Sequence, residues 1–285
     1  MHSGPMAWHW TLDAQEYADA VEPLLGPDPE RHTIALTVVE QELAGADTGT
    51  LFGWWSDTTG RVTGAVSHTP PYAVLFDIVP PDAYVSLVEG LMDRRGVVPG
   101  VNAPVDQAVV FAAVAASRTG TRPVLRHATR LFRCDRLRRP DPMPAGGVRE
   151  PDDDDLDQLV AWTRDFERET HTPPTQVERA VALRKNWDGY RIWCDPAGRP
   201  VSLVGASLPA AGVCRIGPVY TPPGERGRGY AAAATWAMTR DRLDAGLRVV
   251  LFTDLANPTS NALYPRLGYV PVADRAWFSL EPLPD

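Results

Sequence analysis

Lysine is almost absent from this chain of 285 residues: Lys185 is the only one, and arginine supplies the other basic side chains. Acidic residues outnumber basic ones by 36 to 28, which gives a formal net charge of −8. A nucleic-acid-binding surface needs clustered basic side chains that neutralise phosphates. The stretch 130–139 is the nearest candidate, and we interpret it as a strand with outward arginines that runs into a linker. We therefore expect no nucleic-acid partner.

Cysteines, metal-ligand patterns and long apolar runs are also scarce. The cysteines Cys134, Cys194 and Cys214 are far apart and lack metal-ligand spacing, so we expect buried thiols in strands and no metal. No run approaches the roughly 18 apolar residues of a membrane span, and residues 1–10 have neither the basic flank nor the apolar core of a signal peptide. These absences predict a cytoplasmic protein without a membrane partner.

The best candidate for a domain boundary is the segment 138–147, which holds three prolines and two glycines. The chain is long for one compact domain and comfortable for two. We therefore predict an N-terminal domain, 1–140, and a C-terminal domain, 141–285. The acidic run 152–155 is interpreted as the solvated first turn of a helix rather than as a metal site.

A glycine-rich loop between a strand and a helix is the most informative local feature. Its sequence, residues 219–231, reads Val-Tyr-Thr-Pro-Pro-Gly-Glu-Arg-Gly-Arg-Gly-Tyr-Ala. The prolines end strand pairing, the glycines allow a tight turn with inward N–H groups, and 230–242 is a strong helix former. A helix N-terminus with free N–H groups favours an anion, and Arg226 and Arg228 add positive charge. The pattern predicts a phosphate site, but it matches neither the sequence motif of a nucleoside triphosphatase nor that of a dinucleotide-binding fold.

A second segment follows at a suitable distance. Residues 249–253 form an apolar, β-branched run that predicts a buried strand. After it, Asn257 is a good N-cap, Pro258 occupies the first helical position, and Gly268 is a plausible stop. The segment therefore predicts a strand followed by a short, well-bounded helix.

Together these segments resemble the signatures of the GNAT acetyltransferases. The spacing Arg226-x-x-Gly229-x-Ala231 is similar to the loop that holds the pyrophosphate of acetyl-CoA, and the second segment is similar to the family's strand, Asn, tyrosine-bearing helix and Gly-Tyr. The resemblance covers about 148–280 and implies an α/β fold, a twisted mixed sheet flanked by helices. It assigns acetyl-CoA contacts to Val219, Tyr220, Thr221, Arg226, Gly227, Arg228, Gly229, Tyr230, Ala231, Asn257, Ser260 and Tyr264.

The N-terminal half shows a blurred version of the same order of elements. We expect helices near 13–25, 31–44, 82–95 and 105–117, and strands near 51–55, 62–67, 73–79 and 122–134. We place the counterpart of the phosphate loop at 100–106, where the glycine pattern is missing and Asp106 would repel a phosphate. This half therefore resembles a degenerate domain of the tandem GNAT type. Trp54, Trp55 and Tyr72 are expected to line a pocket, unless the two tryptophans belong to the core.

Acetyl transfer to an amine needs an oxyanion donor, an acid for the departing thiolate and a base for the amine. By the resemblance, the N–H of Val219 polarises the thioester carbonyl and Tyr264 protonates the sulfur. Asn257 is interpreted as a cofactor-side residue or as an N-cap alone. The base stays open among Asp254, Glu167, Glu169 and His171, each of which also has a purely structural interpretation.

Three functions remain compatible with the sequence. The first is an N-acetyltransferase that uses acetyl-CoA and a small-molecule amine, acting as a monomer or homodimer. The second is a protein or peptide acetyltransferase that acts on Nα or lysine amines. The third is an acyl-CoA-binding sensor without turnover.

Overall fold

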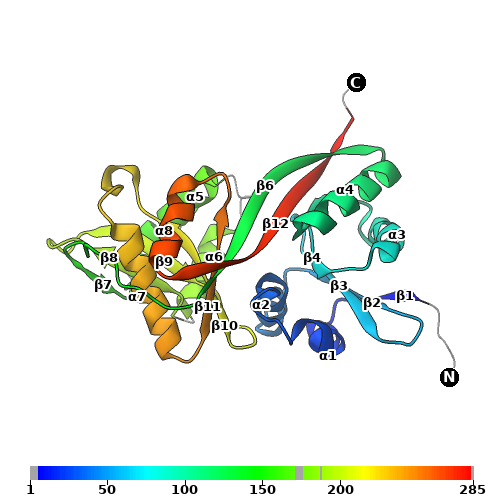
Figure 1. The fold of residues 1–285 in the computed structure, drawn as a ribbon, viewed down its shortest axis with the longest axis horizontal. Helices are drawn as coiled ribbons and strands as arrows, with labels where there is room; N and C mark the ends of the chain where they lie inside the picture. Colours follow the sequence, from blue (N-terminus) through cyan, green and yellow to red (C-terminus); the bar gives the residue numbers. More distant parts are fainter. Residues whose placement is uncertain (1–5, 171–175, 187, 284–285) are drawn as a thin grey trace. The chain divides into compact units, whose positions relative to one another are not determined.

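The chain passes twice through the same order of elements in the computed structural model, which describes residues 6–170, 176–186 and 188–283 (Figure 1). The first pass consists of β1 (Ala7–Thr11), α1 (Ala14–Leu25), α2 (Thr33–Leu43), β2 (Leu51–Ser56), β3 (Val62–His68), β4 (Val74–Ile78), the short 3-10 helix η1 (Pro81–Ala83), α3 (Tyr84–Arg95), β5 (Gly100–Pro104), α4 (Val105–Thr119) and β6 (Thr121–Cys134). The second consists of β7 (Gly147–Arg149), α5 (Leu156–Glu169), α6 (Val177–Asn186), β8 (Tyr190–Cys194), β9 (Pro200–Ala206), β10 (Val213–Tyr220), η2 (Pro223–Glu225), α7 (Tyr230–Asp244), β11 (Arg248–Asp254), α8 (Pro258–Arg266) and β12 (Tyr269–Pro282). The predicted fold class, two tandem mixed α/β halves, is confirmed.

Two compact units can be distinguished, and neither follows the chain strictly in order. Unit 1 contains residues 1–131, 254–256 and 273–285, and unit 2 contains 132–253 and 257–272. The greater part of β12 thus belongs to unit 1 although it ends the second pass. The domain boundary proposed from the sequence, between residues 140 and 141, stays a prediction.

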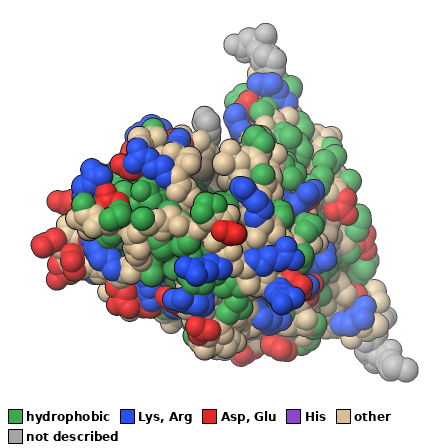
Figure 2. Space-filling view, turned by 60° about the vertical axis from the view of Figure 1, so that its left-hand side comes forward, with side chains coloured by type: hydrophobic (Ala, Val, Ile, Leu, Met, Phe, Trp, Pro, Cys, Tyr) green, Lys and Arg blue, Asp and Glu red, His purple; other side chains and the backbone are tan. Residues whose placement is uncertain are grey.

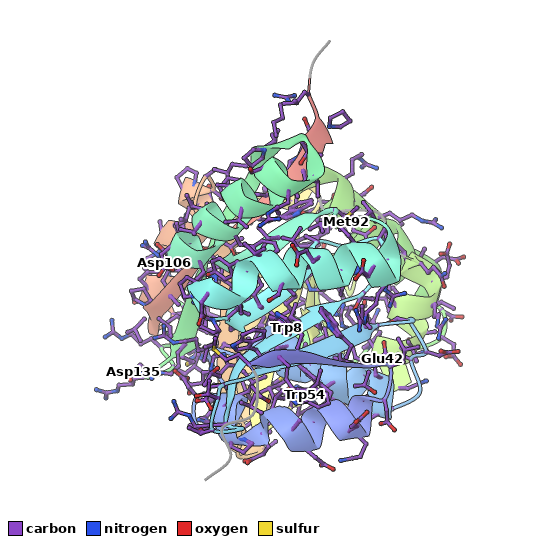
Figure 3. The ribbon with its side chains drawn as sticks, turned by 90° about the vertical axis from the view of Figure 1, so that its right-hand side faces the viewer. Trp8, Glu42, Trp54, Met92, Asp106 and Asp135 are labelled. Atoms are coloured by element: carbon purple, nitrogen blue, oxygen red, sulfur yellow. The ribbon has the colours of Figure 1, made fainter. Side chains whose placement is uncertain are left out.

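Unit 1 is built on a mixed sheet. Strands β1, β2, β3 and β4 pair antiparallel in that order, β4 pairs parallel with β5, and β5 pairs antiparallel with β12. Helices α3 and α4 bury apolar side chains against one face, and α1 and α2 against the other. Figure 3 shows α3 and α4 on the opposite side of the strands from α1. Trp55 is buried in the first of these cores and Trp54 packs against the second, so both tryptophans serve the core.

A cluster of polar side chains is buried inside unit 1. The guanidinium of Arg275, on β12, pairs with the carboxylate of Asp77, on β4, and both side chains are at most 4% exposed. His32, just before α2, places its Nδ1 3.3 Å from Oδ2 of Asp77. Burial, helped by the positive charges of Arg31 and Arg275, outweighs the opposing charge of Asp28 and lowers the pKa of His32 from 6.5 to about 4. The imidazole is therefore neutral in the folded protein at physiological pH.

Acid should destabilise unit 1 through His32. Its folded-state pKa is about 4 and its unfolded value 6.5, so between these pH values the unfolded chain binds a proton that the folded chain does not. The free energy of unfolding should accordingly fall as the pH drops through this window, by up to about 3 kcal/mol. In His32→Gln this loss should be absent, which melting temperatures at neutral and mildly acidic pH would measure. His9→Gln, at an exposed histidine of β1, is the control; an unchanged acid loss in the His32 variant would contradict the assignment.

The strands of unit 2 also pair in a mixture of antiparallel and parallel directions. Strands β7, β8, β9 and β10 pair antiparallel in that order, and β10 pairs parallel with β11. Helices α7 and α8 pack on one face and α5 and α6 on the other. Adjacent residues of β9 serve opposite faces, with Leu203 in the α5/α6 core and Val204 in the α7/α8 core, as the strand period of two requires.

The predicted elements of the first half needed two corrections. Strands β1 and β5 were not predicted, because β1 (Ala-Trp-His-Trp-Thr) is short and β5 (Gly-Val-Asn-Ala-Pro) is bounded by Gly and Pro, which signal loops. The segment 100–106 is therefore β5 and the first turn of α4, and the prediction that it replaces the phosphate loop was wrong. By its place in the repeat, the counterpart of the loop is 79–83, between β4 and α3.

Other predictions concerned surface and thiols. Cys194 and Cys214 are buried in strands as predicted, while Cys134, also in a strand, is half-buried. Acidic and basic side chains are both scattered over the face in Figure 2. Within the described residues, no helix combines the length and apolarity needed to cross a bilayer, and no group of three potential metal ligands is found.

Candidate active site

Two parallel strands of unit 2 separate at their carboxyl ends. β10 and β11 pair from Val213 opposite Arg248 to Ile216 opposite Leu251, and the pairing stops there. Beyond this point β10 continues to Tyr220 and stays paired with β9 through a register shift between Ile216 and Val219. The stretch between them contains Gly217 and Pro218, and proline cannot donate to a ladder. A gap with unpaired strand backbone therefore opens between β10 and β11.

The loop that follows β10 leads to a helix start lined by backbone N–H groups. Gly227 and Gly229 have φ angles of 76° and 82°, the left-handed region that glycine adopts without penalty. The first intrahelical bond of α7 runs from the N–H of Ala233 to the carbonyl of Gly229, so the preceding amides of the first turn have no helical acceptor. Within the described part of the chain, the N–H groups of Gly227 and Gly229 form no hydrogen bond. These amides and the helix dipole favour an anion here.

Both arginines of the loop are engaged by carboxylates. Arg226 forms two hydrogen bonds to Glu169 at the end of α5, of 2.8 and 2.6 Å, and a third of 2.8 Å to the carbonyl of Thr221. Arg228 donates to Glu225 over 2.8 Å. The predicted positive charge is therefore present, but it is paired with carboxylates. In this conformation the backbone amides are the part of the loop available to an anion.

Tyr220, the last residue of β10, joins the loop to α5. Its buried ring places the hydroxyl 3.3 Å from Asp165 and 3.4 Å from Glu169. Burial, followed by the charges of these two carboxylates, raises the pKa of the phenol. Glu169 thus lies within reach of both Tyr220 and Arg226, a grouping that sequence reasoning did not foresee. As a candidate base it would have to exchange its pairing with Arg226.

The start of the loop is fixed by a buried serine. Ser202, on β9, donates to the carbonyl of Tyr220 over 3.1 Å and lies 2.8 Å from the hydroxyl oxygen of Thr221. The linker also reaches the loop, because a Cβ built on Gly229 would lie 3.7 Å from Pro144. Neither Ser202 nor Pro144 could be found from the sequence, since their partners are remote along the chain.

Helix α8 begins as its sequence predicts. The side chain of Asn257 accepts a hydrogen bond of 3.1 Å from the N–H of Ser260, so its role as an N-cap is confirmed. The side chain of Asn261 accepts from Thr253 on β11 over 2.6 Å. These two bonds hold the start of α8 at the carboxyl end of β11, next to the gap. The contacts of Asn257 and Ser260 with a cofactor stay predictions.

Tyr264 lies on the buried side of α8. It packs beside Phe132 and Tyr269, with ring centroids 6.5 and 5.9 Å away, and no hydrogen bond to its hydroxyl is found among the described residues. Burial raises its pKa to about 12, so the phenol keeps its proton throughout the physiological range. Its hydroxyl can therefore act as a hydrogen-bond donor.

The remaining candidates for the base lie in different environments. Asp254 belongs to unit 1, where Oδ1 accepts from the N–H of Ala256 over 2.7 Å and Oδ2 lies 3.4 Å from Nδ1 of His127. Asp254 therefore caps the turn, as one of its two interpretations predicts. It also lies beside the imidazole of His127, which the sequence could not indicate because the two residues are 127 positions apart. Glu167 is half-buried on α5, and His171 lies outside the described residues.

Residues 156–269, which contain the diverging strands, the loop and α8, match the family model described as the acetyltransferase (GNAT) family. This segment is a GNAT domain. The resemblance inferred from the two sequence signatures is therefore confirmed for residues 156–269. No curated protein is significantly similar to the chain in sequence.

Solved structures extend the GNAT fold to both halves. A GCN5-related N-acetyltransferase from Sphaerobacter thermophilus aligns with a TM-score of 0.64 at 18% identity, covering 95% of this chain and 94% of that one. A GNAT-family acetyltransferase from Colwellia psychrerythraea aligns at 0.62 and 9%, covering 96% and 100%. A tandem GNAT protein from the clavulanic acid biosynthesis pathway aligns at 0.57 and 14%, covering 98% and 100%. At these identities the likeness concerns the fold, and it supports the tandem type.

Proposed function

We propose that the GNAT domain of unit 2 transfers an acetyl group from acetyl-CoA to a primary amine of a small molecule, by direct attack in a ternary complex. The separation of β10 and β11 beyond Ile216 and Leu251, beside a loop of free amides, is the observation that carries this proposal. The gap has the unpaired strand backbone that a pantetheine arm needs. The left-handed glycines keep the approach to the start of α7 free of side chains.

The proposed donor site uses backbone groups first. The amides of 227–231 would hold the pyrophosphate at the start of α7, with Arg228 and Arg226 able to turn from their carboxylate partners. Val219 and Tyr220 offer strand backbone to the pantetheine arm, and the N–H of Val219 would polarise the thioester carbonyl. Thr221 anchors the turn, and Asn257 and Ser260 border the gap from α8.

The hydroxyl of Tyr264 is proposed to stabilise the departing sulfur. Its pKa of about 12 lies well above the roughly 8.5 of a thiol, so complete proton transfer to a thiolate is uphill. We therefore expect Tyr264 to act chiefly by donating a hydrogen bond as the thiolate charge develops. Glu169 is the proposed acceptor of the amine proton, directly or through water, once Arg226 has changed partner; Asp254 is the alternative.

Removing the hydroxyl of Tyr264 should affect turnover but not the binding of acetyl-CoA. In Tyr264→Phe we expect kcat to fall by about 10²-fold, because a group that assists proton transfer or charge stabilisation is lost, while acetyl-CoA affinity changes little. Steady-state kinetics and calorimetry would measure the two effects. Tyr269→Phe, which removes a buried hydroxyl bonded to Thr239, is the control for packing. An unchanged kcat in Tyr264→Phe would assign the role to another group.

The reaction itself can be tested with a panel of amine acceptors and detection of free thiol. Thiol release that depends on both acetyl-CoA and a small primary amine supports the proposal. Release only with peptides would favour a protein-modifying enzyme. Binding of acetyl-CoA without release for any amine would favour a sensor.

A further inference from the structure

Unit 1 repeats the strand separation seen in unit 2. β4 and β5 pair in parallel at Val74 opposite Val101 and at Leu75 opposite Asn102, and the pairing stops there although β4 continues to Ile78. In the repeated order of elements, this point corresponds to the end of the pairing between β10 and β11. The first half of the chain therefore retains the gap that receives a pantetheine arm in a GNAT domain.

The gap in unit 1 is filled by the side chain of Arg275. From β12, its Nη2 donates to the carbonyl of Phe76 on β4 over 3.1 Å and to the carbonyl of Asn102 on β5 over 2.8 Å. Its Nε donates to the side-chain oxygen of Asn102 over 3.1 Å, and its Nη1 pairs with Asp77. One guanidinium thus bridges both separating strands while only 4% exposed. Its fork of donors takes the strand carbonyls that a ligand would use.

A glutamine side chain occupies the backbone hydrogen-bonding groups at the end of β4. Gln107 donates to the carbonyl of Asp77 over 3.1 Å and accepts from the N–H of Val79 over 3.2 Å. Gln107 is the third residue of α4, and the third residue of α8 is Ser260. A long side chain therefore seals the strand in unit 1 where a short one borders the gap in unit 2.

The phosphate loop is also missing from unit 1. Five residues, 79–83, separate β4 from α3, whereas nine, 221–229, separate β10 from α7. The shorter segment reads Val-Pro-Pro-Asp-Ala, without glycine or arginine, and Asp82 places a carboxylate near the helix start, where it repels an anion.

The position in unit 1 that corresponds to Tyr264 has no hydroxyl. Counted from the first residue of each helix, Tyr264 is the seventh residue of α8 and Phe111 is the seventh of α4. Phe111 is fully buried and meets the rings of Phe76 and Tyr84 edge-on, at 5.3 and 5.5 Å. This position therefore serves the core of unit 1.

We infer that the donor gap of unit 1 is a guanidinium site occupied by the chain's own Arg275, and that acyl-CoA does not bind there. The residues of this gap do not fit the cofactor, because its strand carbonyls are taken, its loop is short and acidic, and its helix carries Phe111 at the position of Tyr264. The chain should then hold a single acyl-CoA, in unit 2; this second statement rests on the proposed function.

Ligand-induced hydrogen exchange with CoA as the probe tests the inference on the unmutated chain. We expect protection around 217–232 and none around 76–84, together with one CoA per chain by calorimetry. Protection at 76–84, or two CoA per chain, would overturn the inference. An absence of binding would refute the proposed function of unit 2 while agreeing with a closed gap in unit 1, so the two failures are distinguishable.

Chemical rescue tests the guanidinium site itself. Arg275→Ala should lower the melting temperature by more than about 5 °C, because it leaves Asp77 buried without its partner. Guanidinium ion, well below denaturing concentrations, should restore part of this loss, whereas sodium at equal ionic strength should not. The matched control is Arg130→Ala, which removes a pair with Asp274 that is about one-third exposed, and it should show a small loss without rescue. A folded Arg275→Ala chain that guanidinium does not stabilise would overturn the assignment.

Discussion

A glutamate at position 229 is expected to abolish acetyl-CoA binding. Gly229 is the N-cap of α7 with a φ of 82°, and its amide belongs to the group that we propose for the pyrophosphate. Glu would place a negative charge at the positive end of the helix dipole, where a second anion must bind. It would also force a residue with a side chain into the left-handed region, at about 1–2 kcal/mol. Calorimetry should detect no heat of binding in Gly229→Glu.

The same helix provides the matched control. Gly246 follows α7 with a φ of 79° and has open space around it, so Gly246→Glu carries a similar backbone strain and the same charge at the other end. We expect this variant to have a lower melting temperature, because of the backbone strain and the negative charge at the C-terminal end of the helix, but an unaltered affinity for acetyl-CoA. If Gly229→Glu binds acetyl-CoA as the unmutated chain does, the loop is not the cofactor site.

Removing Asp77 should produce the largest loss of stability. In Asp77→Ala the guanidinium of Arg275 remains buried without a counter-charge, and breaking a buried pair in this way costs about 3–5 kcal/mol. Urea denaturation should show the loss in the transition of unit 1, while the transition of unit 2 moves little. Because the chain has two units, the transitions should be fitted separately.

The control for this prediction lies on β12, next to Arg275. Asp274 pairs with Arg130 over 2.7 Å, but both side chains are about one-third exposed, so Asp274→Ala should cost at most about 1 kcal/mol. Equal losses in the Asp77 and Asp274 variants would mean that the buried cluster contributes no more than an ordinary surface pair.

Local signals made the C-terminal site predictable. The glycines and prolines of 219–231 fixed the turn, and Asn257 with Pro258 fixed the start of α8, because caps and turns depend on residues a few positions apart. The resemblance of these segments to GNAT signatures supplied the order of the remaining elements.

Contacts between distant residues left no such signal. Arg275 meets Asp77 across 198 positions, and Arg226 meets Glu169 across 57, so neither pair follows from spacing along a helix or strand. The strand β5 was missed for a related reason, since its Gly and Pro ends suggest a loop and only its neighbours β4 and β12 make it a strand. The sequence thus indicated that the first half lacks a phosphate loop, but the counterpart of that loop was predicted after α3 instead of before it.

The contribution of 273–282 to unit 1 has a consequence for biosynthesis. Ribosomes release a protein from its N-terminus, and domains ordinarily fold in that order. Here the first-made half lacks the strand beside β5, and the cation of its buried ion pair, until residues 273–282 have been synthesised. Nascent chains arrested before residue 273 should therefore expose an incomplete N-terminal half to proteases and chaperones, although most of that half has long since left the exit tunnel.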